Sequence, residues 1–376
     1  MSAKLLCVVP DLECSSVHAR LIEGLAGRLR ASFADTRLFS YTPTDDWTAC
    51  VYGSGDLSDL KHVLGAYDPT HVLVVGGHSF LSQQVRDGVC SQHQPHRQVV
   101  CVLLVDTPLP IPEIASVPPQ FDACVTLGSM AKASVRNAAA AIGALHKSVY
   151  QAARAITPIV PGINTDIFKP IDRTSESFGR EDVRHALFSG QMDDSHMLVV
   201  FPPDQQPELA LGVLSQLTQR LEKPLAGLYM GASPDWQALV DGYDLNDLPL
   251  KQLDWPADAA QRRLVWCAAD LVITTCSQAS WPFDAQEAMA CGAVVCAPDQ
   301  HCWSEALHER AIEAPTPRLT AVGGGYSYTL EIGSTVDTIV RSDWPALTEM
   351  ARLWCEDTRS SWSYTAEQLL EVLGVA

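Results

Sequence analysis

The chain has 376 residues, 47% of them hydrophobic, and a formal net charge of −18 at pH 7. This composition is typical of a globular protein with two domains of ordinary size, and it excludes a disordered chain. No apolar run approaches the roughly 18 residues that a membrane-spanning helix needs. The overall acidity argues against nonspecific nucleic-acid binding by the whole surface.

The charge is unevenly distributed along the chain. Residues 1–170 hold 13 basic and 14 acidic residues, whereas the remainder holds 13 basic and 30 acidic ones. Residues 123–165 contain no acid, so an anionic partner at the N-terminal half stays open. The twelve cysteines are scattered without a C-x-x-C motif, and the first residues resemble a strand and not a signal peptide. We therefore expect reduced, buried cysteines in a cytoplasmic protein, with the surface of the inner membrane as an alternative location.

Short apolar runs alternate with helical stretches in the first half of the sequence. Strands are expected at 5–10, 36–41, 71–77, 99–106 and 123–128, and helices at 17–33 and 131–153. These runs are continuous in Val and Leu, which indicates strands that are buried on both faces, as in parallel sheets covered by helices. Repeated strand–helix units predict an α/β, doubly wound domain.

A polar stretch at 163–195 interrupts this pattern, which then restarts. Strands are expected at 197–203, 225–231, 271–276 and 293–299, a helix at 284–291 and an amphipathic closing helix at 361–374. The sequence therefore predicts two Rossmann-like domains. Their expected bounds are 1–165 for the N-terminal domain, 166–195 for a linker, 196–358 for the C-terminal domain and 359–376 for the closing helix.

The segment SWPFDAQEAMACGAVV, residues 280–295, places Glu287 on a short helix after an expected strand. In open α/β sheets, ligands bind beyond the carboxyl ends of the strands. The two oxygens of a carboxylate can each accept a hydrogen bond from one hydroxyl of a vicinal diol. The alternative is a structural acid near a helix N-terminus, with a stabilising effect below about 1 kcal/mol.

Several segments together resemble one family. The stretch AADLVITTC…EAMACGAVVCAPD, the junction ITPIVPGINTDIFKP, the loop LAGLYMGASPDW and the closing SWSYTAEQLLEVL are similar to motifs of the retaining glycosyltransferases of family 4 type. This resemblance implies the GT-B fold, in which two Rossmann-like domains face a cleft and the C-terminal helix crosses back to the first domain. It also implies metal-independent transfer from a nucleotide sugar that serves as a co-substrate, with no further cofactor.

The resemblance assigns roles to individual residues, and it places Glu287 on the ribose hydroxyls of the donor. The remaining donor-binding candidates are Gly231, Asp254, Ser280, Trp281, Pro282, Phe283 and Ala285. The catalytic candidates are His78, Asp106 and Asp284. His78 follows the expected strand 71–77 and Asp106 ends the strand before the next turn, although a structural histidine and a structural capping acid would suit these positions equally. The candidates for acceptor or phosphate binding are Ser15, Ser16, His18, Lys132 and Arg136, the last two also being compatible with a solvated helix face.

Three positions depart from the family pattern. Ala279 stands where the family has the first acid of its paired motif. The stretch VVFPPDQQPELAL lacks the Arg and Lys that contact the diphosphate, so Lys251, Arg262 or helix N-termini are candidates to supply that charge. Ser15 and Ser16 stand where the family often has glycines.

The sequence thus predicts a retaining hexosyl- or pentosyltransferase that moves a sugar to a hydroxyl acceptor. A cell-surface glycan or a lipid-linked acceptor is the main expectation. One alternative is a phage-type DNA glycosyltransferase that modifies a hydroxymethylated base, and another is an inactive binding protein that retains the fold.

Overall fold

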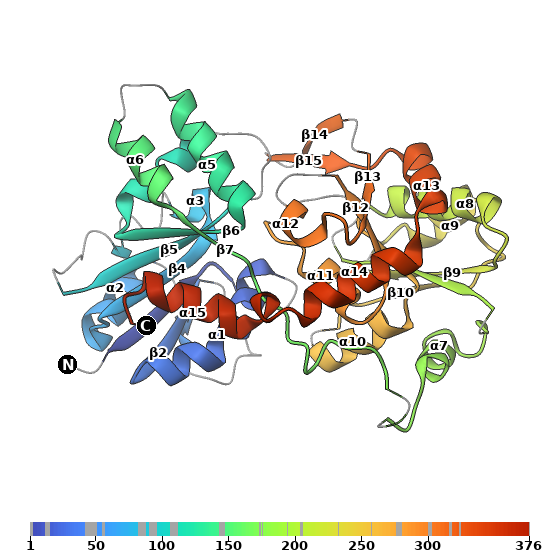
Figure 1. Cartoon of the computed structure of the whole chain (residues 1–376), viewed down its shortest axis with the longest axis horizontal. Coiled ribbons are helices and arrows are strands. Elements are labelled where there is room, and N and C mark those ends of the chain that lie inside the picture. The colour runs from blue at the N-terminus through green and yellow to red at the C-terminus, as the bar shows by residue number, and fades with distance from the viewer. Residues whose placement is uncertain are drawn as a thin grey trace. The chain divides into compact units, whose positions relative to one another are not determined.

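The structure is a computed structural model that describes residues 3–375, except 12–15, 42–50, 55–56, 82–87, 90–95, 106–111, 143–146, 173, 175, 194, 204–205, 232, 257, 276–279, 300–302, 316–317 and 323–324. Side chains are described for the same residues except 51–54, 57–58, 304 and 318–329. The chain divides into two compact units (Figure 1). Unit 1 contains residues 1–162, 279–281 and 359–376, and unit 2 contains residues 163–278 and 282–358. Among the described helices, none is both long and apolar enough to cross a membrane.

Unit 1 is built on a seven-stranded sheet in the order β3-β2-β1-β4-β5-β6-β7, in which every pairing is parallel. Its strands are β1 (Lys4–Val9), β2 (Asp35–Ser40), β3 (Val51–Ser54), β4 (His71–Gly77), β5 (Gln98–Leu104), β6 (Ala123–Leu127) and β7 (Thr157–Ile159). Its helices include α1 (Val17–Ser32), α2 (Leu57–Tyr67), α3 (His78–Phe80), α4 (Pro112–Ala115), α5 (Ser129–Ala141) and α6 (Lys147–Ala155), with a 3-10 turn at Pro118–Gln120.

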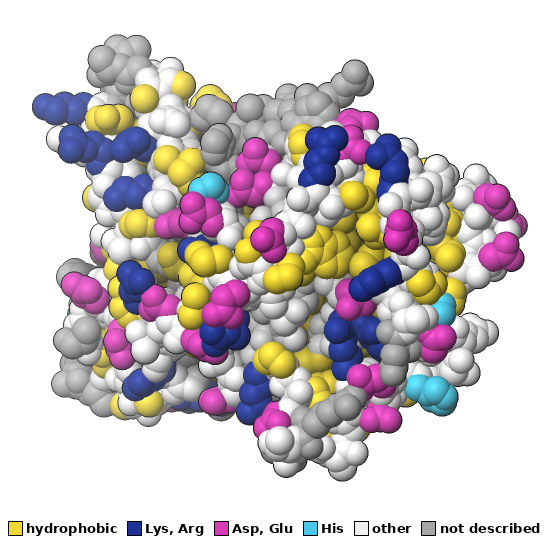
Figure 2. Space-filling model, turned by 45° about the vertical axis from the view of Figure 1, so that its right-hand side comes forward, with side chains coloured by type: hydrophobic (Ala, Val, Ile, Leu, Met, Phe, Trp, Pro, Cys, Tyr) yellow, Lys and Arg dark blue, Asp and Glu magenta, His cyan; other side chains and the backbone are white. Residues whose placement is uncertain are grey.

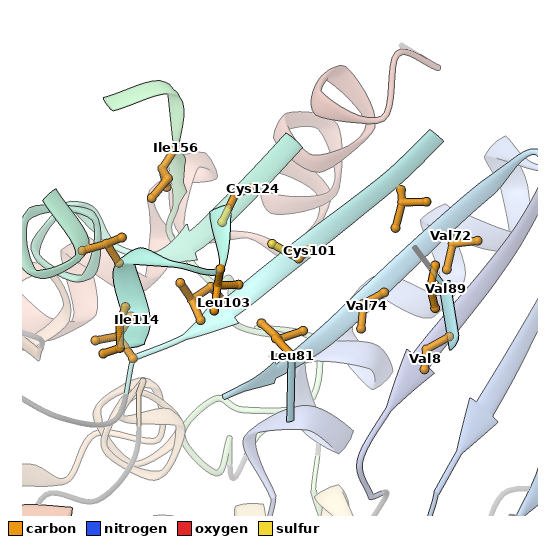
Figure 3. Close-up of a cluster of buried hydrophobic side chains, with 14 of the residues drawn as sticks. Val8, Val72, Val74, Leu81, Val89, Cys101, Leu103, Ile114, Cys124 and Ile156 are labelled. Carbon is orange, nitrogen blue, oxygen red and sulfur yellow. The ribbon is translucent and has the colours of Figure 1, made fainter. Parts of the chain in front are cut away.

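The core of unit 1 explains why its strands are continuous in apolar residues. Helices cover both faces of the sheet, so that consecutive residues of β4 and β5 are buried regardless of the face to which they point. On one face, Val74, Cys101 and Leu103 pack with Ile114 and Leu81 in a single apolar cluster (Figure 3). The predicted doubly wound parallel architecture is confirmed.

Unit 2 repeats this architecture with a six-stranded parallel sheet in the order β10-β9-β8-β11-β12-β13. The strands are β8 (Met197–Phe201), β9 (Leu225–Met230), β10 (Leu250–Leu253), β11 (Leu271–Ile273), β12 (Val294–Pro298) and β13 (Ile312–Ala314), and an antiparallel pair is formed by β14 (Arg318–Val322) and β15 (Gly325–Thr329). The helices are α7 (Arg180–Phe188), α8 (Pro207–Arg220), α9 (Trp236–Gly242), α10 (Ala259–Ala268), α11 (Phe283–Ala290), α12 (Ser304–Leu307), α13 (Ile332–Arg341) and α14 (Trp344–Glu356), followed by a 3-10 turn at Thr358–Ser360.

The closing helix α15 (Trp362–Val372) belongs to unit 1, as the sequence predicts. It packs against α1, where Gly24 leaves room for the Trp362 ring; a Cβ at position 24 would lie 2.1 Å from that ring. A Cβ at Gly162 would meet the backbone of Ser361 at 2.2 Å. Glycine is therefore required at both positions for the close approach of α15.

The structure also refines the expected element bounds. The helix expected at 131–153 is divided into α5 and α6. The short strands β3, β10 and β13 were missed because each has only three or four residues, which is too short for a clear apolar pattern. The stretch 163–195 contains α7 and lies within unit 2.

Candidate functional site

Each sheet has one position where the strand order reverses, and a ligand site is expected beyond the carboxyl ends of the strands there. In unit 2 this position lies between β8 and β11. The backbone N–H of Gln206, the residue before α8, donates to Thr275 Oγ1 at 3.2 Å. This bond joins the segments that follow β8 and β11, and α11 begins shortly after the second of them.

Glu287 lies in the middle of α11 and is buried, with 7% of its surface exposed. Its Oε2 accepts hydrogen bonds from Arg262 Nε at 3.3 Å and from Trp266 Nε1 at 3.1 Å. Its Oε1 accepts from the Arg262 guanidinium at 3.4 Å. Both donors come from α10, and so they hold the carboxylate in one orientation and join α10 to α11.

Aromatic rings surround the arginine of this pair. Arg262 is 3% exposed, and its guanidinium lies 5.8 Å from the Phe168 ring centre and 5.9 Å from that of Trp255. The rings of Trp255 and Trp266 are 5.9 Å apart. Burial of a guanidinium is costly unless it is paired, and here a carboxylate and two aromatic faces offset that cost. We call Arg262, Trp266 and Glu287 the Glu287 cluster.

Gly231 and Asp254 follow the neighbouring strands β9 and β10. Gly231 has φ +147°, which favours glycine, and its N–H donates to Leu253 O at 2.9 Å. Asp254 is exposed beyond the end of β10. The structure therefore places two predicted donor-binding residues side by side at the carboxyl end of the sheet.

The segment before α11 supplies the other predicted donor-binding residues. Pro282 caps the helix, and Phe283 and Ala285 are buried within its first turns. Asp284 is half-buried in the first turn. Ser280 and Trp281 are each 1% exposed and group with unit 1, while Ala279 lies outside the described residues.

In unit 1 the strand order reverses between β1 and β4. His78 is half-buried and directly follows β4, as the sequence predicts. Ser16 caps α1, with its Oγ accepting the N–H of Ala19 at 3.1 Å. His18 Nδ1 lies 3.3 Å from a carboxylate oxygen of Asp11. Three predicted residues thus flank one reversal point, whereas Ser15 and Asp106 lie outside the described residues.

Lys132 and Arg136 lie on α5, the former half-buried and the latter exposed. Lys147 and Arg154 on the neighbouring α6 are exposed too. Figure 2 shows Lys and Arg side chains gathered at the upper left, the end formed by α5 and α6. The acid-free stretch of the sequence therefore forms a basic surface on unit 1.

Both residues suggested as replacements for the diphosphate contacts have other partners. Arg262 belongs to the Glu287 cluster, and Lys251 Nζ donates to Leu187 O at 2.5 Å. The Arg262–Glu287 pair could not be predicted directly from the sequence, because the two residues are 25 positions apart on different helices. The one indication in the sequence is that Arg262, a basic residue, stands beside apolar residues in the helix that precedes β11.

A pocket of about 650 Å³ lies between α7 and α10, next to β10. Its lining is mainly apolar and includes Phe178, Leu187, Leu253, Trp255 and Leu264. Trp255 therefore contributes both to this pocket and to the aromatic surroundings of Arg262. Within the described part of the chain, no group of three or more His, Cys, Asp or Glu side chains is arranged to hold a metal ion.

These features define the fold class: the chain has the two Rossmann-like domains of the GT-B glycosyltransferase fold. No protein-family model matches the sequence, and no curated protein matches it either. Solved structures are similar over nearly the whole of both chains.

Among these structures is sucrose-phosphate synthase from Thermosynechococcus elongatus, with a TM-score of 0.73 and 12% identity over 99% of this chain and 98% of that one. HepE from Anabaena, in complex with UDP and glucose, has a TM-score of 0.69 and 14% identity over 100% of both chains. A putative UDP-N-acetylglucosamine 2-epimerase from Listeria monocytogenes has a TM-score of 0.57 and 13% identity over 99% and 96%. At such identities the likeness shows the shared fold.

Proposed function

We propose that the protein is a glycosyltransferase that moves a sugar from a nucleotide-sugar donor to a hydroxyl acceptor. The observation that carries the proposal is the position of the Glu287 cluster on the helix that follows β11, at the reversal point of a GT-B-type sheet. The fold is shared with HepE, which was solved with UDP and glucose, and with a sucrose-phosphate synthase.

Glu287 is the proposed contact for the ribose of the donor. Arg262 and Trp266 already donate to its carboxylate, so a ribose diol must share the carboxylate with these donors or displace one of them. A carboxylate has about four acceptor positions, and sharing is therefore compatible with its chemistry. The bonds from Arg262 and Trp266 orient the Glu287 carboxylate before the nucleotide sugar binds, so that little free energy is needed to fix its position on binding.

Further residues have proposed roles in binding the nucleotide sugar and in catalysis. Gly231 and Asp254 are the proposed contacts to the nucleotide, and His78 is the proposed catalytic group near the transferred sugar. The leaving diphosphate must be stabilised electrostatically. Because Lys251 and Arg262 have other partners, backbone N–H groups at helix N-termini, such as that of α8, are proposed for this role.

The finer features of the activity are also proposals. We propose a retaining, metal-independent hexosyl or pentosyl transfer by a cytoplasmic protein. The basic surface of α5 and α6 favours an acceptor that carries negative charge, such as a phosphate-bearing lipid-linked glycan at the inner membrane. DNA is the alternative acceptor, and its binding would weaken steeply with salt, with several counterions released.

The proposal is tested by incubating the protein with a panel of UDP-, ADP-, GDP- and dTDP-sugars and measuring release of the nucleoside diphosphate. We expect slow release from a small subset of the panel even without acceptor. Equal rates of nucleoside diphosphate release by the unchanged protein and the Glu287→Gln variant would contradict the proposal. So would a lack of both release and binding for every donor in the panel. Proton NMR of the released sugar or product then distinguishes retention from inversion.

A further inference from the structure

Two helices of unit 2 turn an apolar face toward the pocket beside β10. On α7, Val183, Ala186 and Leu187 recur at i, i+3 and i+4, a spacing that places them on one face of the helix. Leu264 and Val265 lie on α10, which packs against α7 (Figure 1). All five residues line the pocket of about 650 Å³ between the two helices. The amphipathic patterns of α7 and α10 therefore form most of its walls.

The folded chain buries the side chains of this pocket only in part. Phe178, Leu253, Trp255 and Leu264 line it and are half-buried, although Leu and Phe are most often fully buried in folded proteins. The volume of the pocket lies within the range of roughly 300–1,000 Å³ that small-molecule sites occupy. A ligand with an apolar body would therefore remove from water a surface that the protein leaves accessible.

The charged residues of the pocket favour a cation over an anion. Asp182 on α7 and Asp254 after β10 both line the pocket and are both exposed, which places them at its rim. Lys251 lines it too, but its Nζ donates to Leu187 O near the carboxyl end of α7, where the helix dipole offsets the positive charge. The chain after residue 170 holds 13 basic and 30 acidic residues, so the potential around unit 2 attracts cations.

The pocket is distinct from the Glu287 cluster, although both use α10. Leu264 lines the pocket, whereas Arg262 and Trp266, each two positions away and so on the opposite side of the helix, donate to Glu287. Trp255 connects the two places, because it lines the pocket while its ring centre lies 5.9 Å from the Arg262 guanidinium. The acids of the rim would repel the diphosphate of a nucleotide, and so the pocket does not suit the proposed donor.

We propose that this pocket is a second ligand site, which takes an amphipathic cation: a molecule with an apolar body and one protonated amine. The apolar body packs against Phe178, Leu253 and Leu264. The amine pairs with Asp182 or Asp254 at the rim, in a charge-assisted hydrogen bond. Recognition therefore combines the burial of apolar surface with the pairing of one charge.

The test is calorimetric titration of the unchanged protein with decylamine, decanol and decanoate at neutral pH and low salt, each below its solubility limit and the concentration at which it forms micelles. The three probes share one apolar chain and differ in the charge of the head group. We expect decylamine to bind about tenfold more tightly than decanoate, with decanol between them, as two exposed charge pairs allow. This preference should shrink as salt is added, because the acids at the rim are exposed.

Variants of α7 locate the binding. Ala186→Trp fills the pocket from an exposed position and should weaken the binding of all three probes at least about tenfold, through the apolar surface that they no longer bury. His185→Trp is the matched control, because it adds the same ring at the preceding exposed position, outside the described lining, and should leave the affinities unchanged. Asp182→Asn should lower the affinity for decylamine about threefold. An unchanged affinity for decanol in Asp182→Asn shows that the pocket itself is intact.

Binding of decanoate as tight as that of decylamine would overturn the proposal, and so would a lack of binding for every probe. Unchanged affinities in Ala186→Trp would place the binding elsewhere and overturn it as well. Displacement of decylamine by UDP, ADP or GDP would assign the pocket to the nucleotide donor instead. These readouts require no transfer of a sugar, and so they are independent of the proposed transferase activity.

Discussion

Two carboxylate–arginine clusters flank β11, a half-buried one at Asp270 and a buried one at Glu287. Asp270 directly precedes the strand and accepts from Arg180 at 2.8 Å, from Arg184 at 2.5 Å and from the backbone N–H of Leu198 at 2.7 Å. Glu287 lies on the helix after the strand and accepts from Arg262 and Trp266. Arg184 and Arg262 are similarly buried, at 6% and 3% exposure.

The two clusters differ in the groups that their charged side chains contact. Arg184 also donates to the backbone oxygens of Ala268 and His196, so that the Asp270 cluster joins the amino ends of β8 and β11 to α7. The Glu287 cluster is bounded by aromatic rings and joins α10 to α11, the helices before and after β11. Ion pairing alone therefore does not identify a functional carboxylate, and the proposed role of Glu287 depends on its position after β11.

The largest effect is expected from removing the buried arginine of the Glu287 cluster. Arg262→Ala leaves Glu287 without its cation, and the free energy of unfolding should fall by about 3–5 kcal/mol. Arg184→Ala should cost less, because Arg180 still pairs with Asp270. Denaturant unfolding followed by tryptophan fluorescence measures this loss. A loss below about 1 kcal/mol for Arg262→Ala would mean that the pair is not formed in solution.

In unit 1, His78 follows β4 at the second reversal point. If it acts on the transferred sugar, His78→Ala should lower the turnover about 100-fold while donor affinity changes by less than about threefold, a difference below 1 kcal/mol. The comparison of kcat with the dissociation constant of the donor tests this role. Unchanged turnover would remove His78 from the site.

A smaller stability effect is expected when both charges of a cluster are replaced. The double variant Arg262→Met/Glu287→Met replaces the pair by apolar side chains of similar length, and its stability should lie within about 1.5 kcal/mol of the unchanged protein. Nucleotide binding should nevertheless be lost, because the carboxylate is gone. Retained binding in a stable double variant would assign the cluster a purely structural role.

The smallest effect is expected at a third carboxylate–arginine pair, Glu176 with Arg263. The Arg263 guanidinium holds the pKa of the Glu176 carboxyl below its ordinary value of 4.5. The pair therefore stabilises the folded state above pH 4.5, and this contribution is lost as the pH falls through the lowered pKa. Denaturation midpoints of the unchanged protein and Glu176→Gln should differ above pH 4.5 and converge as the pH falls through the lowered pKa. A difference that stays constant throughout the acid range would contradict this assignment.

The fold could be predicted largely from the sequence, and the reasons are physical. The continuous apolar runs of β4, β5 and β8 are short and rich in Val and Leu, which favours strands buried on both faces over helices. The return of α15 to unit 1 was expected from the resemblance, while its cause, the space left by Gly24 and Gly162, required the structure.

The site was predictable only in part. The positions of Glu287 and His78 after strands followed from local pattern, because an element's end is a property of neighbouring residues. The partners of Glu287 did not, since Arg262 and Trp266 reach it through the packing of α10 on α11.

The most direct test of the account is calorimetric titration of UDP, ADP and GDP into the unchanged protein, Glu287→Gln and Asp270→Asn. Both variants replace an arginine-paired carboxylate oxygen by an amide nitrogen, and so they are matched in chemistry, with Asp270 the less buried of the two. The account predicts that at least one nucleotide binds the unchanged protein and Asp270→Asn with the same affinity. Binding to Glu287→Gln should be at least about tenfold weaker, as expected for loss of a charged acceptor. Equal affinities for all three proteins, or equal weakening in both variants, would contradict it.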